Sequence, residues 1–123
     1  MKIKICVITD NDNNLSKVNK FKQDLKKIYN SDNFEMFYDM DENRRTFEIC
    51  LYNDNKELIQ QNLIIQQNTL YEHKYANGDI YLGRMLNDKT GTALELVKNP
   101  AVIQNMIIPE YIKNALYFIK NEE

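Results

Sequence analysis

The sequence contains few of the residues that build disulfide or zinc frameworks. Only two of its 123 residues are cysteines, Cys6 and Cys50, and His73 is its single histidine. The cysteines lie far apart and each sits among apolar residues, as buried free thiols do. We therefore expect neither a disulfide nor a zinc site. His73 has no evident acid or nucleophile partner, so we expect it at the surface rather than as a general base.

Long apolar runs and a strong net charge are also missing. No run approaches the roughly 20 residues of a membrane-spanning helix, and residues 1–4 lack the apolar core of a signal peptide. We therefore expect a cytoplasmic protein that does not enter a membrane. The formal net charge of −2 gives no overall basic signature, so any contact with DNA must be local. Length and an ordinary balance of apolar and charged residues predict one globular domain, 1–123.

The first part of the chain holds an apolar run followed by two acids. Residues 5–8 are Ile-Cys-Val-Ile, and Asp10 and Asp12 follow with Asn11 between them. The run predicts a strand covered on both faces, and open α/β sheets place their chemistry at the carboxyl ends of such strands. If the chain stays extended there, both carboxylates point the same way and reach one cation, for which oxygen ligands favour Mg²⁺ or Mn²⁺. The alternative is a turn with a helix cap, since Asp and Asn favour both.

Periodic apolar residues predict most of the remaining elements. The spacing predicts helices over residues 15–29, 55–67, 79–86 and 92–98, and a last helix from Pro109 to Ile119. Expected caps are Asn13 or Asn14 for the first helix and Asn53 or Asp54 for the second. Residues 34–38 predict a second strand, and residues 49–52 either end a strand or open a helix. We expect a turn-rich link over residues 87–91. Asn99-Pro100 should stop the helix over residues 92–98. We therefore expect an α/β fold with a small, mostly parallel sheet flanked by helices.

The polar side of the helix predicted over residues 15–29 is rich in lysine: Lys17, Lys20, Lys22, Lys26 and Lys27. Lys17, Lys20 and Lys27 are our candidates for contacts with a DNA backbone, because such contacts neutralise phosphate charge. A solvated helix face explains the same pattern, since Asp24 interrupts it and lysine is common on exposed helices.

Two loop motifs are approached but not matched. Asp10-x-Asp12-x-Asn14 opens like a calcium-binding EF-hand loop, but Leu15 replaces the required glycine and Phe21 the closing glutamate. Residues 83–90 fit a phosphate-binding loop except at Asp88, whose carboxylate would face the phosphates. We therefore expect neither site.

Residues 5–15 also resemble the haloacid-dehalogenase-like phosphotransferases, in which an apolar strand ends in Asp-x-Asp. That resemblance implies Asp10 as covalent nucleophile, Asp12 as acid/base and Lys89 as the charge-neutralising lysine. The family completes its magnesium site with acids at the end of a late strand. The acids beyond Lys89 do not end a strand-like run: Glu95, Glu110, Glu122 and Glu123.

A wider resemblance covers residues 5–119. It rests on three segments in order: residues 7–12, Thr46-Phe47-Glu48, and Lys89 with Gly91 and Ala93 opening a helix, followed by a matching end over residues 108–119. Together they resemble the carboxyl-terminal topoisomerase-primase (TOPRIM) nuclease domain of the overcoming-lysogenization-defect family of ATP-dependent endonucleases. The resemblance implies a DNA endonuclease of phage defence or nucleic-acid processing, with a partial TOPRIM-like fold. It implies that Asp10, Asp12 and Glu48 bind divalent metal, Mg²⁺ or Mn²⁺, and that Lys89 stabilises charge at the scissile phosphate.

The resemblance also implies a partner. The family's domain begins with an earlier strand that carries a metal-binding glutamate and a second acid one turn onward, and residues 1–4 contain neither. Three carboxylates are too few for the two metals that share this kind of hydrolysis. We expect another chain, such as an ATPase subunit, to supply the missing strand, and we expect an oligomer because a missing strand exposes a sheet edge. The alternative is a non-catalytic interaction module that remains from such a domain.

Overall fold

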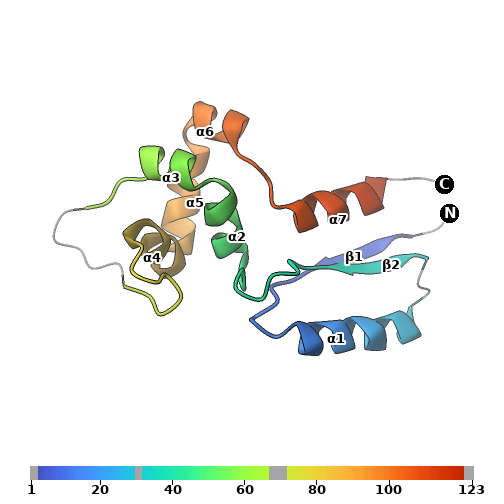
Figure 1. Ribbon diagram of the computed structural model, residues 1–123. Coiled ribbons are helices and arrows are strands. Elements are labelled where there is room, and N and C mark those ends of the chain that lie inside the picture. Colours follow the sequence, from blue (N-terminus) through green and yellow to red (C-terminus); the bar gives the residue numbers. More distant parts are fainter. Residues whose placement is uncertain (1–2, 30–31, 67–71, 121–123) are drawn as a thin grey trace. The chain divides into compact units, whose positions relative to one another are not determined.

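The computed structural model of the chain describes residues 3–29, 32–66 and 72–120. These residues form two β-strands and seven α-helices, which Figure 1 labels in chain order. They divide into two compact units. The sheet unit comprises Met1–Cys50 with Ile108–Glu123, and the helical unit comprises Leu51–Ile107. None of the described helices is both long enough and apolar enough to cross a membrane.

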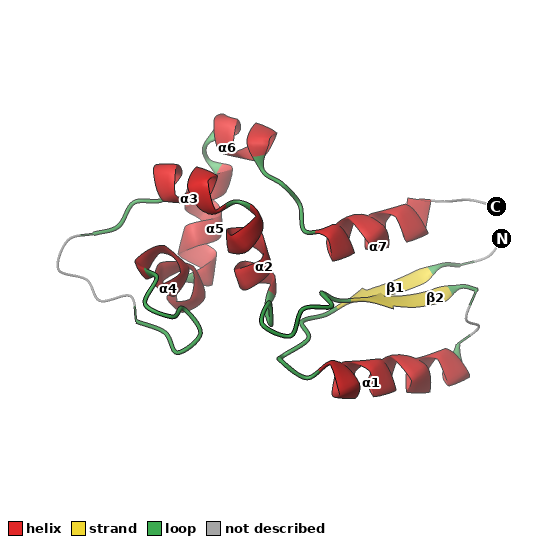
Figure 2. Cartoon of the chain, viewed as in Figure 1, coloured by secondary structure: helices red, strands yellow, loops and turns green. Residues whose placement is uncertain are grey.

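The sheet unit is a small α/β layer structure. Strands β1 (Ile5–Ile8) and β2 (Phe34–Phe37) pair in parallel, with Ile5 opposite Phe34 and Ile8 opposite Phe37. Helix α1 (Leu15–Ile28) follows β1, and α7 (Glu110–Lys120) returns to the same unit from the far end of the chain. The strands lie between α1 and α7 in Figure 2. The predicted α/β class with a small parallel sheet is confirmed.

Helix α1 packs on the face of the sheet that carries the largest buried side chains. Asn14 caps the helix by accepting a hydrogen bond from the Lys17 N–H at 3.0 Å, as Asn does at this position. The apolar side of α1 then packs against a buried cluster of β2 and the residue after it, with Val7 of β1 joining them: Phe34, Met36 and Tyr38 against Leu15, Val18 and Leu25. The prediction of a helix capped near Asn14 is confirmed.

Helix α7 covers the other face of the sheet. Side chains alternate along a strand, so Phe37 points away from the Phe34 and Met36 face. Its ring meets that of Phe118 at 5.9 Å between centroids, while Tyr111 and Ala115 are the buried residues of α7. The helix predicted from Pro109 to Ile119 is confirmed, with Glu110 as its first residue and Lys120 as its last.

Strand β1 is less covered than the sequence predicted. The side chains of Ile5 and Ile8 are 41% and 45% exposed, whereas Phe34 and Met36 of β2 are 1% exposed. Within the described residues, β2 is the single strand that pairs with β1. Both faces of β1 therefore carry a helix, but the strand is only partly covered because it lies at the edge of the sheet. A four-residue apolar run does not reveal whether a second strand lies beside it.

Two lysines of α1 bind a carboxylate of β2. Lys22 Nζ lies 2.9 Å from Glu35 Oε1 and Lys26 Nζ 3.1 Å from Glu35 Oε2, and the Met36 N–H donates to Oε1 at 3.1 Å. Burial alone raises the pKa of Glu35, but hydrogen bonds from Lys22, Met36 and Lys26 outweigh it and hold the pKa below its ordinary value. Glu35 therefore ties α1 to β2 in its ionised form.

This ion pair predicts a pH-dependent contribution to stability. A lowered folded-state pKa means that the contribution is present above the ordinary glutamate pKa and is lost as the pH falls. Glu35→Gln should reduce the free energy of unfolding by about 1 kcal/mol at neutral pH, and the difference from wild type should shrink as the pH falls below the ordinary glutamate pKa and through the lowered pKa of Glu35. Urea unfolding across this pH range measures it, with the exposed Glu42→Gln as control. A difference that stays constant with pH would contradict the assignment.

The helical unit is built from short capped helices. After α2 (Phe47–Asp54), which begins in the sheet unit, come α3 (Lys56–Asn62), α4 (Ile80–Asn87), α5 (Lys89–Val97) and α6 (Pro100–Asn105). Three caps start the last three of these helices: Asp79, Asp88 and Asn99 each accept backbone N–H groups of the first turn. The unit's core is formed mainly by the following buried side chains: Tyr52, Ile59, Leu63, Leu82, Met85, Leu86, Leu96 and Val102.

Several predicted boundaries change in the structure. Residues 49–52, for which strand and helix were both open, are helical, so Asn53 and Asp54 lie inside α2 and Asn55 precedes α3. The predicted helix over 55–67 ends at Asn62, and its expected last residue, Gln67, lies outside the described residues. The predicted link over 87–91 is wrong, because Asp88 caps a helix that begins at Lys89.

Helix α6 was not predicted. Pro100 was expected to stop the preceding helix, and α5 does end at Val97. Proline is also favoured in the first turn of a helix, where its missing N–H costs nothing. Pro100 occupies that place in α6, and Asn99 caps it by accepting from the Ala101 N–H.

The start of α5 predicts a coupling between two residues. Asp88 Oδ1 accepts from the Gly91 N–H at 3.0 Å, and a Cβ at position 91 would lie 2.2 Å from Asp88 Oδ2. Gly91→Ala should therefore displace the cap, so that the loss of about 1 kcal/mol offsets the gain in helix propensity. In an Asp88→Ala background the same change should stabilise by about 1 kcal/mol. Urea unfolding of the four proteins measures the cycle, and equal effects in both backgrounds would exclude the coupling.

Candidate functional site

The loops that follow the two parallel strands meet at one end of the sheet unit. The loop after β1 carries Asp10, Asn11 and Asp12, and the loop after β2 runs over residues 39–46 into α2. Their backbones are joined directly, because the Asp12 N–H donates to the Arg45 carbonyl at 3.1 Å. This is the end of the sheet at which the sequence placed the candidate site.

Asn11 holds the two loops together. Its side chain is 1% exposed, and its Nδ2 donates to the carbonyls of Asp39 and Asp41 at 2.9 and 2.8 Å. The Arg44 carbonyl lies at 3.3 Å from the same nitrogen, so it shares one of the two N–H groups. Asn11 Oδ1 accepts from the Asn13 N–H at 2.8 Å. All the hydrogen-bonding groups of this amide are therefore used inside the sheet unit.

The chain turns sharply after Asn11. The Asn14 N–H donates to the Asn11 carbonyl at 2.9 Å, and the two residues between them, Asp12 and Asn13, have φ values of 51° and 60°. Asp and Asn tolerate this left-handed conformation better than other residues with a Cβ. The condition that the chain stay extended past Asp10 is therefore not met, and alternation along a strand does not place Asp10 and Asp12 side by side.

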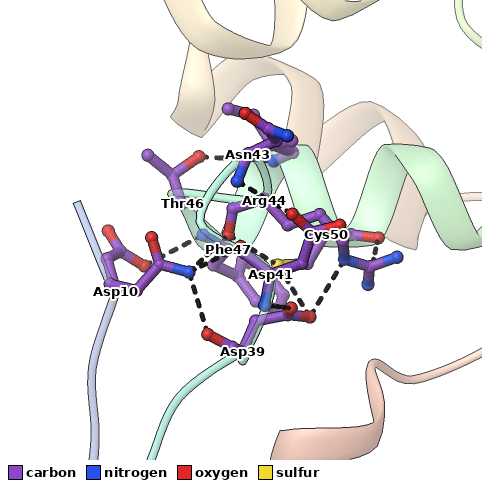
Figure 3. A network of polar contacts seen from close by, with 10 residues as sticks. Asp10, Asp39, Asp41, Asn43, Arg44, Thr46, Phe47 and Cys50 are labelled. Carbon is purple, nitrogen blue, oxygen red and sulfur yellow. Dashed lines mark hydrogen bonds and ion pairs between the residues drawn. The ribbon is translucent and has the colours of Figure 1, made fainter. Parts of the chain in front are cut away.

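The loop after β2 is ordered by its own polar side chains (Figure 3). Asp39 Oδ1 accepts from the Asp41 N–H and Asp41 Oδ1 accepts from the Asn43 N–H, both at 2.9 Å. Arg44 Nε donates to Asp39 Oδ2 at 2.9 Å. These are side-chain turns of the kind that Asp favours. The carboxylates of Asp39 and Asp41 therefore help to fix the path of the loop.

Cys50 closes the same network from α2. Its Sγ donates toward Asp39 Oδ2 at 3.6 Å and the Arg44 carbonyl at 3.4 Å, and it is a free, buried thiol as predicted. Burial, with the nearby Asp39 charge, raises the pKa of Cys50 to about 11. Burial likewise raises the pKa of Tyr111, and the electrostatic interactions with Cys50 and Asp10 raise it further. The thiol is thus protonated near neutral pH and acts as a hydrogen-bond donor.

Asp10 binds the start of α2. Its Oδ1 accepts from the Phe47 N–H at 2.9 Å, and Thr46 Oγ1 accepts from the Ile49 N–H at 3.3 Å. A carboxylate at this end of a helix also interacts favourably with the helix dipole. Glu48 lies in the same first turn of α2. The structure therefore brings the segment of Asp10 beside the segment of Glu48, as the sequence required of a shared site.

The predicted site residues are not all gathered. Among residues 3–29, 32–66 and 72–120, no three His, Cys, Asp or Glu side chains lie close enough together to hold a metal ion. Asp10, Asp12 and Glu48 are thus not arranged as a three-carboxylate metal group, and their assignment as metal ligands stays a prediction. Lys89 begins α5 and belongs to the helical unit.

The lysines of α1 fall into two sets. Lys22 and Lys26 are partly buried against Glu35, whereas the three DNA-backbone candidates, Lys17, Lys20 and Lys27, are exposed. Their spacing of three and seven residues places the exposed three along one side of the helix. The structure therefore distinguishes lysines with a structural role from those that are exposed to solvent.

The structure also places the acid Glu95, from the phosphotransferase pattern, and His73. The described residues after Lys89 form helices, and Glu95 of α5 pairs with Arg84 at 2.8 Å. The late strand that the phosphotransferase pattern needs is not found among them. His73 is half-buried, and its Nδ1 accepts from the Tyr75 N–H at 3.1 Å.

Sequence reasoning missed the residues that build this region. Asn11 was treated as the spacer between two acids, and residues 39–43 only as a polar loop. A signal was present in the spacing Asp39-x-Asp41-x-Asn43, because Asp and Asn side chains that bond two residues onward produce successive turns. The three carbonyls that Asn11 binds have no such signal, since any residue supplies a carbonyl.

Comparison of the chain with protein-family models, with curated proteins and with solved structures gives no match.

Proposed function

We propose that this chain is a domain or subunit of a metal-dependent DNA endonuclease with a partial TOPRIM-like fold, completed by a partner chain. The observation that carries the proposal is the hydrogen bond from the Phe47 N–H to Asp10 at 2.9 Å. It joins the end of β1 to the turn that holds Glu48, so two of the three acids that the motif order selects come from neighbouring segments. The parallel strands and their polar carboxyl-terminal loops are compatible with such a site.

The shortage of acids is the reason for a partner in this proposal. Among the described residues, no three His, Cys, Asp or Glu side chains are grouped to hold a metal ion. Hydrolysis of a phosphodiester by paired metals needs more ligands than Asp10, Asp12 and Glu48 provide. A second chain would add carboxylates, and oxygen ligands of this kind suit Mg²⁺ or Mn²⁺. Following the family resemblance, an ATPase subunit is the proposed source.

The exposed lysines supply the proposed contact with DNA. Lys17, Lys20 and Lys27 are exposed on α1, and in this proposal they bind the phosphate backbone. Each phosphate that a protein neutralises makes binding more sensitive to salt. Replacing all three with alanine should weaken binding of a labelled duplex and reduce the salt slope by about 2 to 3. Fluorescence anisotropy measures this, with Lys56, Lys74 and Lys98 replaced together as a charge-matched control from the helical unit.

The test of the nuclease proposal uses Asp10→Asn. An amide oxygen still accepts from the Phe47 N–H, so this variant keeps the bond that starts α2 and removes only the negative charge. Plasmid cleavage by the chain together with the partner chain that completes the site is followed while Mg²⁺ or Mn²⁺ is titrated, and Asp24→Asn on the exposed face of α1 is the control. We expect Asp10→Asn to lower cleavage by at least about 100-fold and Asp24→Asn to leave it unchanged. Cleavage that survives in Asp10→Asn refutes the assignment.

A second function is favoured by a specific observation. The carboxylate of Asp10 already stabilises the start of α2, and Asn11 joins the loops, so this end of the sheet has a structural role without metal. The chain would then be a non-catalytic interaction module. Tight binding of Mn²⁺ at two sites by the full chain, measured by isothermal titration, would argue against the module.

A further inference from the structure

The outer edge of β1 is open in the part of the chain that the structure describes. In a parallel pair, alternate residues turn their backbone groups toward the neighbouring strand and away from it. The N–H groups of Ile5 and Thr9 donate to the carbonyls of Asn33 and Phe37, on the side of β2. The N–H and C=O groups of Cys6 and Ile8 therefore point away from β2. Such an edge is a template for pairing with another strand.

Apolar side chains are exposed beside this open edge, on both faces of the sheet. Ile3, Ile5 and Ile8 are 73%, 41% and 45% exposed, and Phe21 and Ile28 of α1 are 54% and 73% exposed. We call these five residues, with the outer backbone edge of β1, the β1 surface. Exposed large apolar groups next to an open strand edge mark an interaction site.

The contacts of α1 show why Phe21 and Ile28 belong to this surface. Lys22 and Lys26 reach Glu35 of β2, so that flank of the helix lies over the β2 side of the sheet. At 100° per residue, Phe21 and Ile28 lie on the opposite flank, across the half-buried Val18 and Leu25. The two exposed residues therefore lie on the side of β1, which has no further strand beside it among the residues that the structure describes.

We propose that β1 pairs in antiparallel orientation with β1 of a second copy of this chain, giving a four-stranded sheet with the two β2 strands outside. A two-fold axis makes the central pair antiparallel and presents the same surface on both copies. The ends of β1 carry opposite charge, since Lys4 precedes the strand and Asp10 follows it. Lys4 Nζ donates to the Phe118 carbonyl at 3.3 Å and Asp10 accepts from the Phe47 N–H, so both charges are held at the ends of the strand. Antiparallel pairing brings Lys4 of each copy near Asp10 of the other, and this charge complementarity favours a second copy as the occupant.

The charge pairing also sets the register. If Lys4 lies opposite Asp10, Val7 meets its own copy on the two-fold axis and Cys6 lies opposite Ile8. The outward backbone groups of Cys6 and Ile8 then form a hydrogen-bonded pair, with Cα atoms about 5.5 Å apart. That separation lies within the range that a disulfide spans. Phe21 and Ile28 of both copies are covered in the same dimer.

The oligomeric state of the full chain, measured without metal or DNA, tests the dimer and does not require nuclease activity. In such a dimer the second copy takes the edge of β1, so a partner chain would have to bind elsewhere. Sedimentation equilibrium should show a dimer for the wild type and for Cys6→Ser. Cys6→Pro removes only an outward N–H, which an edge strand tolerates, and should weaken the dimer at least about tenfold. Phe21→Lys with Ile28→Lys should do the same without altering the strand, whereas Ile103→Lys, at an exposed site of the helical unit, should not.

Cross-linking tests the register. Ile8→Cys should form a disulfide with Cys6 of the second copy when copper-phenanthroline accepts the two electrons, and the two thiol protons pass to solvent. The control is Ile8→Cys with Cys6→Ser, which should give no covalent dimer on a non-reducing gel. A monomeric wild type overturns the proposal, including the case in which another protein binds β1. A dimer that is weakened neither by Cys6→Pro nor by Phe21→Lys with Ile28→Lys overturns the proposal as well.

Discussion

Replacing Asn11 with alanine should lower the free energy of unfolding by about 3 kcal/mol. The substitution leaves the Asp39 and Asp41 carbonyls and the Asn13 N–H without the partner that binds them at 2.8 to 2.9 Å. The side chain that is removed is 1% exposed, so water does not replace it without local opening. Asn11→Asp should cost more, because a carboxylate would face carbonyl oxygens. Urea unfolding followed by circular dichroism measures both changes.

The matched control is Asn19→Ala. Asn19 is exposed on α1, and alanine is the better helix former, so the expected change is a gain of no more than about 0.7 kcal/mol. Hydrogen exchange adds a local measurement, since the Asn13 amide should exchange faster in Asn11→Ala than in wild type. If Asn11→Ala and Asn19→Ala unfold at the same urea concentration, Asn11 does not hold the two loops together.

The fold was predictable where periodicity and capping agree over several turns. Helix α1 has an apolar side of four turns and Asn14 ahead of it, and α7 has the same pattern after Pro109. Helix α6 has six residues, too few for a periodic signal, and its Pro100 served equally well as a stop for α5. The exposure of β1 was not predictable, because the sequence of one strand does not reveal how many strands pair beside it.

The sequence predicted where in the fold the candidate region lies, but it did not predict how the side chains there are arranged. An apolar run that ends in Asp10-x-Asp12 correctly marked the end of β1 where loops meet. The direction of those acids depends on the left-handed turn at Asp12 and Asn13, which Asn11 stabilises from within. Asn11 in turn depends on carbonyls from the loop after β2. Such long-range backbone contacts leave no residue-type signal, so the sequence alone did not show how the acids are oriented.

Asn55 should be as important to the helical unit as Asn11 is to the sheet unit. It is 5% exposed, and although it precedes α3 its side chain does not cap that helix. Its Nδ2 donates to the Leu51 and Ile107 carbonyls at 3.0 and 2.7 Å, and its Oδ1 accepts from the Ile107 N–H at 2.6 Å. The amide thus binds both backbone groups of Ile107, which is 52 residues further along the chain.

Asn55→Ala should therefore lower the free energy of unfolding by about 3 kcal/mol, because three backbone groups lose their partner in a buried place. The control is Asn53→Ala, at an exposed position of α2, for which we expect a change of no more than about 0.5 kcal/mol. Hydrogen exchange gives the decisive readout, since the Ile107 amide should lose its protection in Asn55→Ala and keep it in Asn53→Ala. An Ile107 amide that stays protected in both variants would show that Asn55 does not anchor the end of the helical unit.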